Sequence, residues 1–130
     1  MFELSVDAQF SAAHCLRGYE GDCGRIHGHT FKVTVIVAAQ NNSNIGMAMD
    51  FKIIAKILKE SVKDFDHRFL NEHEYFLTIN PTSENIAYIL FNRLSKEISG
   101  EGISVLSVTV AESDHYRATY RKASNHEQQS

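Results

Sequence analysis

Alternation of apolar and polar residues in two long segments restricts this chain to folds that contain a sheet with one buried face. Residues 2–10 read FELSVDAQF, with an apolar side chain at every even position. A second run begins around Thr30 and places Phe31 and three valines on one parity. Because successive side chains of a strand point to opposite faces, both runs predict strands that each cover a core with one face.

The period changes to three and four residues after the turn-forming segment QNNSNIG. Apolar residues of the segment 51–65 then recur on one side of a helix, for which Asp50 is a suitable N-cap. The single proline precedes Thr82, which can cap a second helix that is expected to end near Gly100. Between the two helices, residues 66–81 show no period and are expected to be irregular.

Two further alternating runs, from Ile103 and from Tyr116, close the chain. The order strand, strand, helix, helix, strand, strand predicts an α+β domain with an antiparallel sheet and two helices on one face. Residues 1–122 are expected to form this single domain, and residues 123–130 a disordered tail. Because such a sheet leaves its edge strands unpaired, a homo-oligomer that closes the sheet through neighbouring subunits is expected.

Composition excludes several classes of protein. Of the 130 residues, 43% are hydrophobic, which is enough for a core, and the net charge of -3 comes from charges spread along the chain. This distribution argues against a nucleic-acid or membrane surface. The chain has no apolar run long enough to span a bilayer and no hydrophobic leader at its amino terminus, so the sequence predicts a cytoplasmic protein.

Three histidines are the strongest indication of chemistry. The segment CGRIHGH places His27 and His29 on one parity, about 7 Å apart along a strand, and His14 follows the first strand on its inward parity. Three imidazoles from neighbouring strands can hold one metal ion and leave a position open, the arrangement of catalytic zinc. The alternative is that the histidines pack and hydrogen-bond without a metal. Cys23 can be a fourth ligand, but an open site favours a role as acid, base or nucleophile.

Other acidic and imidazole groups have roles that the sequence leaves open. Asp66 and His67 form a carboxylate–imidazole pair suited to proton transfer, although such pairs are commonly solvated loop residues. Glu112 shares the parity of two valines, so its carboxylate can point inward and accept two parallel N–H bonds from a ligand, or it can end the strand in water. Glu84 is expected to complement the dipole of the second helix.

These residues lie within motifs that resemble the 6-pyruvoyl-tetrahydropterin synthase family. The motifs are FSAAH, CGRIHGHTF, GMAMDF, FDHRFLN, NPTSENIA and AES, and they occur in this order from Phe10 to about Tyr120. The resemblance implies the tunnelling fold, in which trimers close antiparallel sheets into a barrel and two trimers usually stack as a hexamer. It also implies active sites that lie between subunits.

The resemblance further implies a role for each matching position. The zinc ligands correspond to His14, His27 and His29. The catalytic cysteine and its partners correspond to Cys23, Asp66 and His67. The carboxylate that anchors the pterin corresponds to Glu112, and further polar contacts to the ring correspond to Thr82 and Ser83. No role is implied for Cys15, His73 or His115.

Within the family, the three-residue gap between Cys23 and His27 resembles bacterial 6-carboxy-5,6,7,8-tetrahydropterin synthase of queuosine biosynthesis. This likeness implies a carbon–carbon lyase that uses Zn²⁺ to convert 7,8-dihydroneopterin triphosphate into 6-carboxy-5,6,7,8-tetrahydropterin, with loss of triphosphate and acetaldehyde. One alternative is 6-pyruvoyl-tetrahydropterin synthase, a carbon–oxygen lyase that stops before side-chain cleavage. The other is a metal- or pterin-binding module without turnover. Cys15 and Ser113 depart from the residues common in the family.

Overall fold

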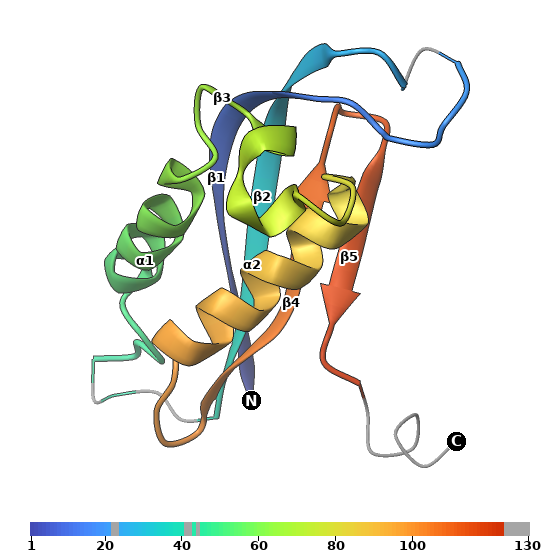
Figure 1. Cartoon of the computed structure of the whole chain (residues 1–130). Helices are drawn as coiled ribbons and strands as arrows, with labels where there is room; N and C mark the ends of the chain where they lie inside the picture. The colour runs from blue at the N-terminus through green and yellow to red at the C-terminus, as the bar shows by residue number, and fades with distance from the viewer. Residues whose placement is uncertain (22–23, 41–42, 44, 124–130) are drawn as a thin grey trace.

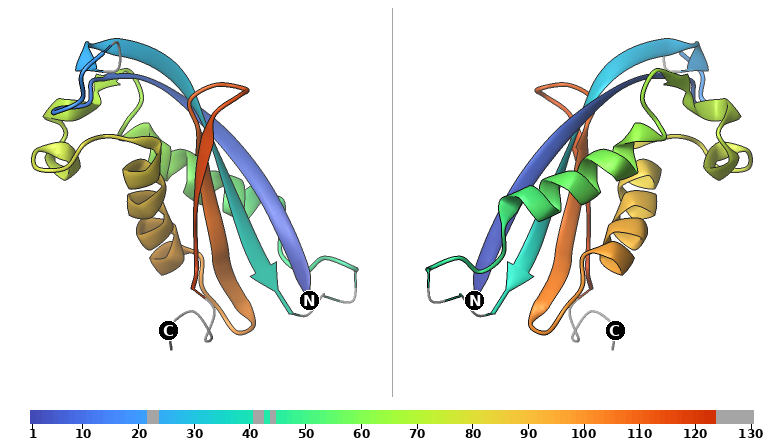
Figure 2. Two further views of the ribbon diagram at one scale, coloured as in Figure 1. Left: turned by 90° about the vertical axis from the view of Figure 1, so that its right-hand side faces the viewer. Right: turned by 90° about the vertical axis from the view of Figure 1, so that its left-hand side faces the viewer.

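Strands and helices follow the predicted order in the computed structural model, which describes residues 1–21, 24–40, 43 and 45–123. A curved sheet carries both helices on one face and leaves the other face open (Figures 1 and 2). The strands are β1 (Phe2–His14), β2 (His27–Ala39), β3 (Arg68–Phe69), β4 (Ile103–Ala111) and β5 (Arg117–Arg121). The helices of the described residues include α1 (Phe51–Lys63), α2 (Ser83–Glu97) and the short 3₁₀ helices η2 (Leu70–Glu72) and η3 (Glu74–Phe76).

The strands form one sheet with the order β3-β1-β2-β4-β5. The four predicted strands pair antiparallel with their neighbours, and β1 and β2 are in register from Phe2 opposite Ala39 to His14 opposite His27. A fifth strand makes the sheet mixed instead of wholly antiparallel, because β3 pairs parallel with the end of β1. A two-residue strand has no period of its own, so the segment 66–81 gave no sign of it.

Capping side chains begin both helices where the sequence predicted them. Asp50 Oδ1 accepts the N–H of Lys52 at 2.8 Å, and Thr82 Oγ1 accepts the N–H of Asn85 at 3.1 Å. The second helix ends at Glu97, slightly before the predicted end. Among the described residues, no helix combines the length and the apolar character needed to cross a membrane.

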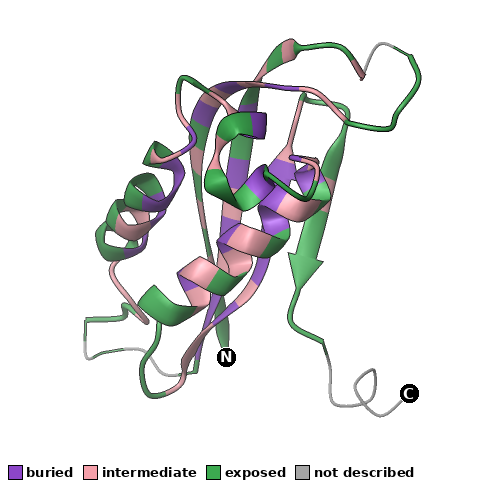
Figure 3. Cartoon of the chain, in the orientation of Figure 1, coloured by how far each residue is buried: buried purple, intermediate pink, exposed green. Residues whose placement is uncertain are grey.

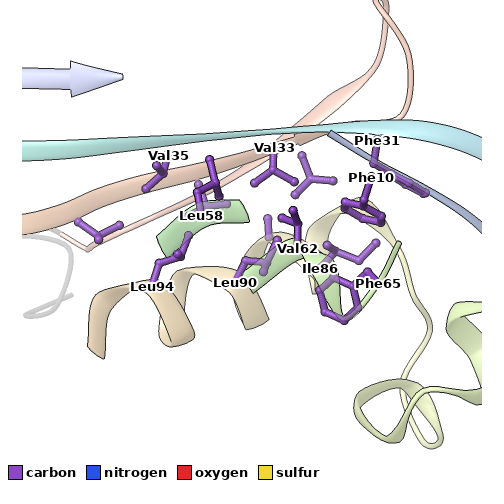
Figure 4. Packing of buried hydrophobic residues seen from close by; sticks show 14 of the residues in the cluster. Phe10, Phe31, Val33, Val35, Leu58, Val62, Phe65, Ile86, Leu90 and Leu94 are labelled. Carbon is purple, nitrogen blue, oxygen red and sulfur yellow. The ribbon is translucent and has the colours of Figure 1, made fainter. Parts of the chain in front are cut away.

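The core lies between the sheet and the two helices. Inward side chains of β1, β2 and β4 meet those of α1 and α2. Figure 3 colours each residue by its burial, and Figure 4 shows the packing of the buried side chains from close by. At one end of this core, Phe10 and Phe31 stack with their ring centroids 4.9 Å apart. The His14 ring stands edge-on to Phe31, with centroids 5.3 Å apart. The histidines therefore lie on the same inward faces of β1 and β2 as the apolar side chains, directly next to this packed aromatic pair.

Candidate metal centre

The structure brings His14, His27 and His29 together at the end of β1 and the start of β2. The ring centroids are 4.5 Å apart for His14 and His27, 5.3 Å for His14 and His29, and 4.9 Å for His27 and His29. One ring nitrogen from each histidine can be chosen so that all three atoms lie within 4.8 Å of one another. This is close enough for one metal ion to be bound by all three imidazoles with little movement.

Backbone carbonyls orient two of the three rings. His14 Nδ1 lies 2.7 Å from the carbonyl oxygen of Pro81, and His27 Nδ1 lies 2.7 Å from that of Arg25. Because a carbonyl only accepts hydrogen bonds, Nδ1 must carry the proton in each bond, which leaves the Nε2 lone pair free for a metal when the ring is neutral. The same arrangement of a backbone acceptor behind an imidazole is common at metal sites.

Two imidazole nitrogens of this cluster are buried without a partner. Nε2 of His14 and Nε2 of His29 have no hydrogen-bond partner among the described residues. A buried polar atom without a partner costs about 1–3 kcal/mol, so such atoms call for an explanation. A metal ion bound between the rings would satisfy both nitrogens. The three residues therefore fit a metal ion that is commonly bound by imidazole, such as zinc.

Burial also keeps the His14 imidazole in the form that binds metals. Removal from solvent, the largest effect, lowers the pKa of His14 from its ordinary value, and the hydrogen bond to Pro81 opposes this shift. The neighbouring His27 lowers the pKa again. The neutral form is thus favoured near neutral pH, and only neutral imidazole offers a lone pair to a metal.

A carboxylate, that of Glu112, lies beside the three histidines at the same end of the molecule. Glu112 directly follows β4, and its Oε1 accepts the hydroxyl of Ser83 at 3.1 Å. Its other oxygen, Oε2, lies 3.9 Å from Nε2 of His29. Ser83 is buried and Glu112 is about one-third exposed, so the carboxylate lies at the boundary between the core and an accessible site. Thr82 lies next to this pair but uses its oxygen to cap α2.

Asp66 and His67 lie at the outer edge of β1 and are held there by Ser11. Asp66 Oδ1 accepts the N–H of Ser11 at 2.9 Å, and the N–H of His67 donates to the Ser11 carbonyl at 2.6 Å. The bond from Ser11 is the main cause that lowers the pKa of Asp66, with a smaller effect from His67. Asp66 therefore has a structural contact besides any catalytic role.

The Asp66–His67 pair is itself well formed and lies outside the histidine cluster, and His67 lines one open pocket with His29. His67 Nδ1 lies 3.0 Å from Asp66 Oδ2, and the His67 side chain is 82% exposed. Within the described part of the chain, no hydrogen bond or ion pair joins the two groups to the histidine cluster. His67 has a positive φ of 58°, which is unusual for a residue other than glycine. The predicted thiol, Cys23, lies outside the described residues.

The groups that orient the rings cannot be recognised in the sequence. The acceptors of Pro81 and Arg25 are backbone carbonyls, which every residue possesses, and Pro81 lies 67 positions from His14 in the chain. Only the fold brings such a pair together. The proline before Thr82 predicts the start of a helix, and only the structure shows that its carbonyl lies next to a predicted ligand.

Comparison with known proteins places these features in one family. A family model described as 6-pyruvoyl tetrahydropterin synthase matches residues 3–123. A protein of Archaeoglobus fulgidus, named provisionally as a 6-carboxy-5,6,7,8-tetrahydropterin synthase, is 39% identical over 119 residues that cover 92% of this chain and 95% of the relative. The 6-carboxy-5,6,7,8-tetrahydropterin synthase of Haemophilus influenzae is 29% identical, covering 86% of this chain and 93% of the relative. A dihydroneopterin monophosphate aldolase of Pyrococcus furiosus is 37% identical, covering 72% and 75% respectively.

Solved structures agree with the sequence comparison. The 6-pyruvoyl tetrahydropterin synthase of Caenorhabditis elegans superposes with a TM-score of 0.83 at 27% identity, covering 94% of this chain and 96% of that one. The corresponding enzyme of Plasmodium vivax shares the fold with a TM-score of 0.73 at 22% identity, covering 93% and 97%. The chain therefore has the tunnelling fold and belongs to the 6-pyruvoyl tetrahydropterin synthase family, whose members are metal-dependent enzymes that act on pterins.

Proposed function

We propose that this protein is a zinc-dependent 6-carboxy-5,6,7,8-tetrahydropterin synthase acting on 7,8-dihydroneopterin triphosphate. The observation that carries the proposal is the convergence of three imidazoles, two with buried and unpartnered nitrogens, beside the Glu112 carboxylate. The names of the relatives from Archaeoglobus fulgidus and Haemophilus influenzae support this branch. The products are 6-carboxy-5,6,7,8-tetrahydropterin, triphosphate and acetaldehyde, which places the reaction in the biosynthesis of queuosine and related 7-deazapurines.

His14, His27 and His29 would hold the metal, with Nε2 of His14 and of His27 facing it because their Nδ1 atoms are occupied by carbonyls. Zinc bound here would act as a Lewis acid that lowers the pKa of the hydroxyls on the pterin side chain. Three protein ligands leave a coordination position for these hydroxyls, as in catalytic zinc sites. Phe31 packs edge-on against the rings of His14 and His29, with centroids 5.3 and 5.5 Å apart, and would help to keep these two ligands in place.

Glu112 is proposed to anchor the pterin ring. Pterins present neighbouring N–H donors on one edge, and a carboxylate accepts two parallel N–H bonds with good geometry. The Ser83 hydroxyl fixes the orientation of this carboxylate through Oε1, while free lone pairs remain on both oxygens. Thr82 accepts a bond as the helix cap, so its own hydroxyl proton remains available for the ligand.

Cys23, Asp66 and His67 are proposed to move the protons. Cys23, as a thiolate, would remove a proton from the side-chain carbon, and His67 would exchange protons through its Nε2 while Asp66 holds Nδ1. Because His67 is exposed and lies at the outer edge of β1, the pair would act on the site of a neighbouring subunit. The proposed assembly is a homo-oligomer, a trimer or a hexamer, in which exposed sheet edges meet.

The main competing reaction is that of 6-pyruvoyl tetrahydropterin synthase, which loses triphosphate but keeps the side chain intact. The structural likeness to the Caenorhabditis elegans enzyme favours it as the second candidate. Both reactions would use the same zinc, anchor and proton carriers, so the geometry of one chain is compatible with each. The short spacing between Cys23 and His27 is the feature that favours the carboxy product.

The product formed by the purified, zinc-loaded protein tests the proposed function. We expect anaerobic incubation with 7,8-dihydroneopterin triphosphate to give 6-carboxy-5,6,7,8-tetrahydropterin and equimolar acetaldehyde, detected by mass spectrometry. A pyruvoyl product without acetaldehyde would assign the protein to the second candidate. Unchanged substrate with zinc bound would instead indicate a metal-binding protein without this activity.

Replacement of Glu112 by glutamine tests the anchor without changing its shape. The variant loses the negative charge and one acceptor oxygen, and a hydrogen bond to a charged group contributes about 1.5–3 kcal/mol. We therefore expect the dissociation constant for a non-reactive pterin to rise roughly 10- to 100-fold in isothermal titration, with zinc content unchanged. Glu84→Gln, on the exposed first turn of α2, is the matched control. Equal pterin affinity in both variants would remove Glu112 from the binding site.

A further inference from the structure

Two asparagine side chains take the place of a neighbouring strand where the chain continues beyond β1. Asn71 accepts the N–H of Cys15 at 2.9 Å and donates to the Cys15 carbonyl at 2.8 Å. Asn80 likewise accepts the N–H of Arg17 and donates to the Arg17 carbonyl, with both bonds at 2.9 Å. Each amide thus satisfies both backbone groups of one residue, as a paired strand residue would. The backbones of residues 15 and 17 are therefore held in place directly after His14.

Asn80 connects this edge to the acceptor that orients His14. Its peptide carbonyl accepts the side-chain N–H of Asn85 at 2.8 Å, which ties it to the first turn of α2. The next residue is Pro81, whose carbonyl accepts the Nδ1–H of His14. Chain and hydrogen bonds therefore form a closed loop, which runs from His14 along the backbone to Arg17, across to Asn80, and back through Pro81 to the ring.

Arg17 strengthens the same loop from its other side. Its guanidinium donates to the carbonyl oxygens of Phe76 and Ile79, the latter at 2.7 Å. The segment before Pro81 is therefore held by Arg17 through both backbone and side chain. These contacts restrain the Pro81 carbonyl relative to the backbone of His14, and with it the imidazole that the carbonyl accepts from.

We propose that Asn80 is a positioning residue of the metal centre, which through the Pro81 carbonyl holds the His14 imidazole in its Nδ1–H tautomer with Nε2 facing His27 and His29. The inference rests on the proposed function in one respect, that a metal occupies the three histidines. Asn80 would act on the metal centre indirectly. The carbonyl that accepts a hydrogen bond from a ligating imidazole fixes the tautomer and the direction of that ring, and here Asn80 holds the carbonyl.

The first experiment reads the tautomer and needs no metal. Long-range ¹H–¹⁵N spectra of the metal-free protein, at a pH where the imidazoles are neutral, distinguish a protonated Nδ1 from a protonated Nε2. We expect wild-type His14 to show the Nδ1–H form alone and Asn80→Ala to show a mixture. Asn80→Asp keeps the acceptor for the Arg17 N–H but loses the donor to its carbonyl, so an intermediate result is expected.

The second experiment measures zinc affinity by competition with a chromophoric chelator. Loss of an outer-shell partner typically lowers metal affinity about 10- to 100-fold, which is the decrease expected for Asn80→Ala. Asn92→Ala, on an exposed part of α2, is the matched control and should bind zinc like the wild type. A residue with a purely structural role would lower the melting temperature without changing either the tautomer or the affinity of the folded protein.

The outcomes separate this inference from the proposed function. A single Nδ1–H tautomer in Asn80→Ala together with the zinc affinity of Asn92→Ala would overturn the positioning role, even if wild-type protein binds zinc and turns over. A wild-type protein that binds no zinc would refute the proposed metal centre and, with it, the role of Asn80 in holding a ligand. Mixed tautomers and weakened zinc binding in the same folded variant would support the proposal.

Discussion

Replacement of His27 by alanine is expected to abolish zinc binding and turnover together while the fold persists. His27 would supply one of three ligands and is only partly buried, so its loss removes a metal bond without opening a cavity in the core. Removal of an outer-shell partner already costs about 10- to 100-fold in metal affinity, and loss of a ligand should exceed this range. Equilibrium dialysis followed by elemental analysis measures the effect.

His115→Ala is the control for this variant. His115 is exposed, and its described hydrogen bond uses the backbone N–H, which the substitution retains. It should bind one zinc per chain like the wild type. Full zinc occupancy in His27→Ala would show that the metal is bound elsewhere and would contradict the proposed ligand set.

Replacement of Cys23 by alanine is expected to remove most of the turnover while zinc remains bound. General acid–base catalysis by a positioned side chain contributes about 10²- to 10⁴-fold, and kcat should fall within that range with little change in KM. Single-turnover product formation, measured on protein of known zinc content, separates this loss from a loss of metal.

Cys15→Ala serves as the thiol control. The bonds that hold Cys15 to Asn71 involve its backbone, so they do not depend on the thiol. This variant should turn over at nearly the wild-type rate. Normal turnover in Cys23→Ala would exclude the thiol from the reaction and would leave His67 as the remaining candidate base.

The sequence predicted those parts of the fold and site that follow from local periodicity. Side-chain parity placed His27 and His29 on the face of Phe31, and the same alternation in β1 carried His14 to that face. Both helix starts were predictable because Asp50 and Thr82 act on residues two and three positions away. Such local effects leave a readable pattern in the chain.

The parts that escaped prediction depend on contacts between distant residues. Strand β3 is two residues long, and its position is set by pairing with β1 more than fifty residues away in the sequence. From the sequence alone, Asn71 and Asn80 could equally be surface turn residues. Nothing near them in the sequence indicates that their side chains bond to the backbone of a distant segment. The sequence predicts that Asp66 and His67 form a pair for proton transfer, and only the structure adds the bond between Asp66 and Ser11.

Anomalous diffraction at the zinc absorption edge, from crystals of the zinc-loaded protein, would locate the metal and so test the proposed metal centre. We expect one anomalous peak per chain, with nitrogens of His14, His27 and His29 about 2.0–2.1 Å from it and Glu112 beside it. A peak bound by other residues, or crystals grown with zinc that show none at these histidines, would contradict the proposed metal centre.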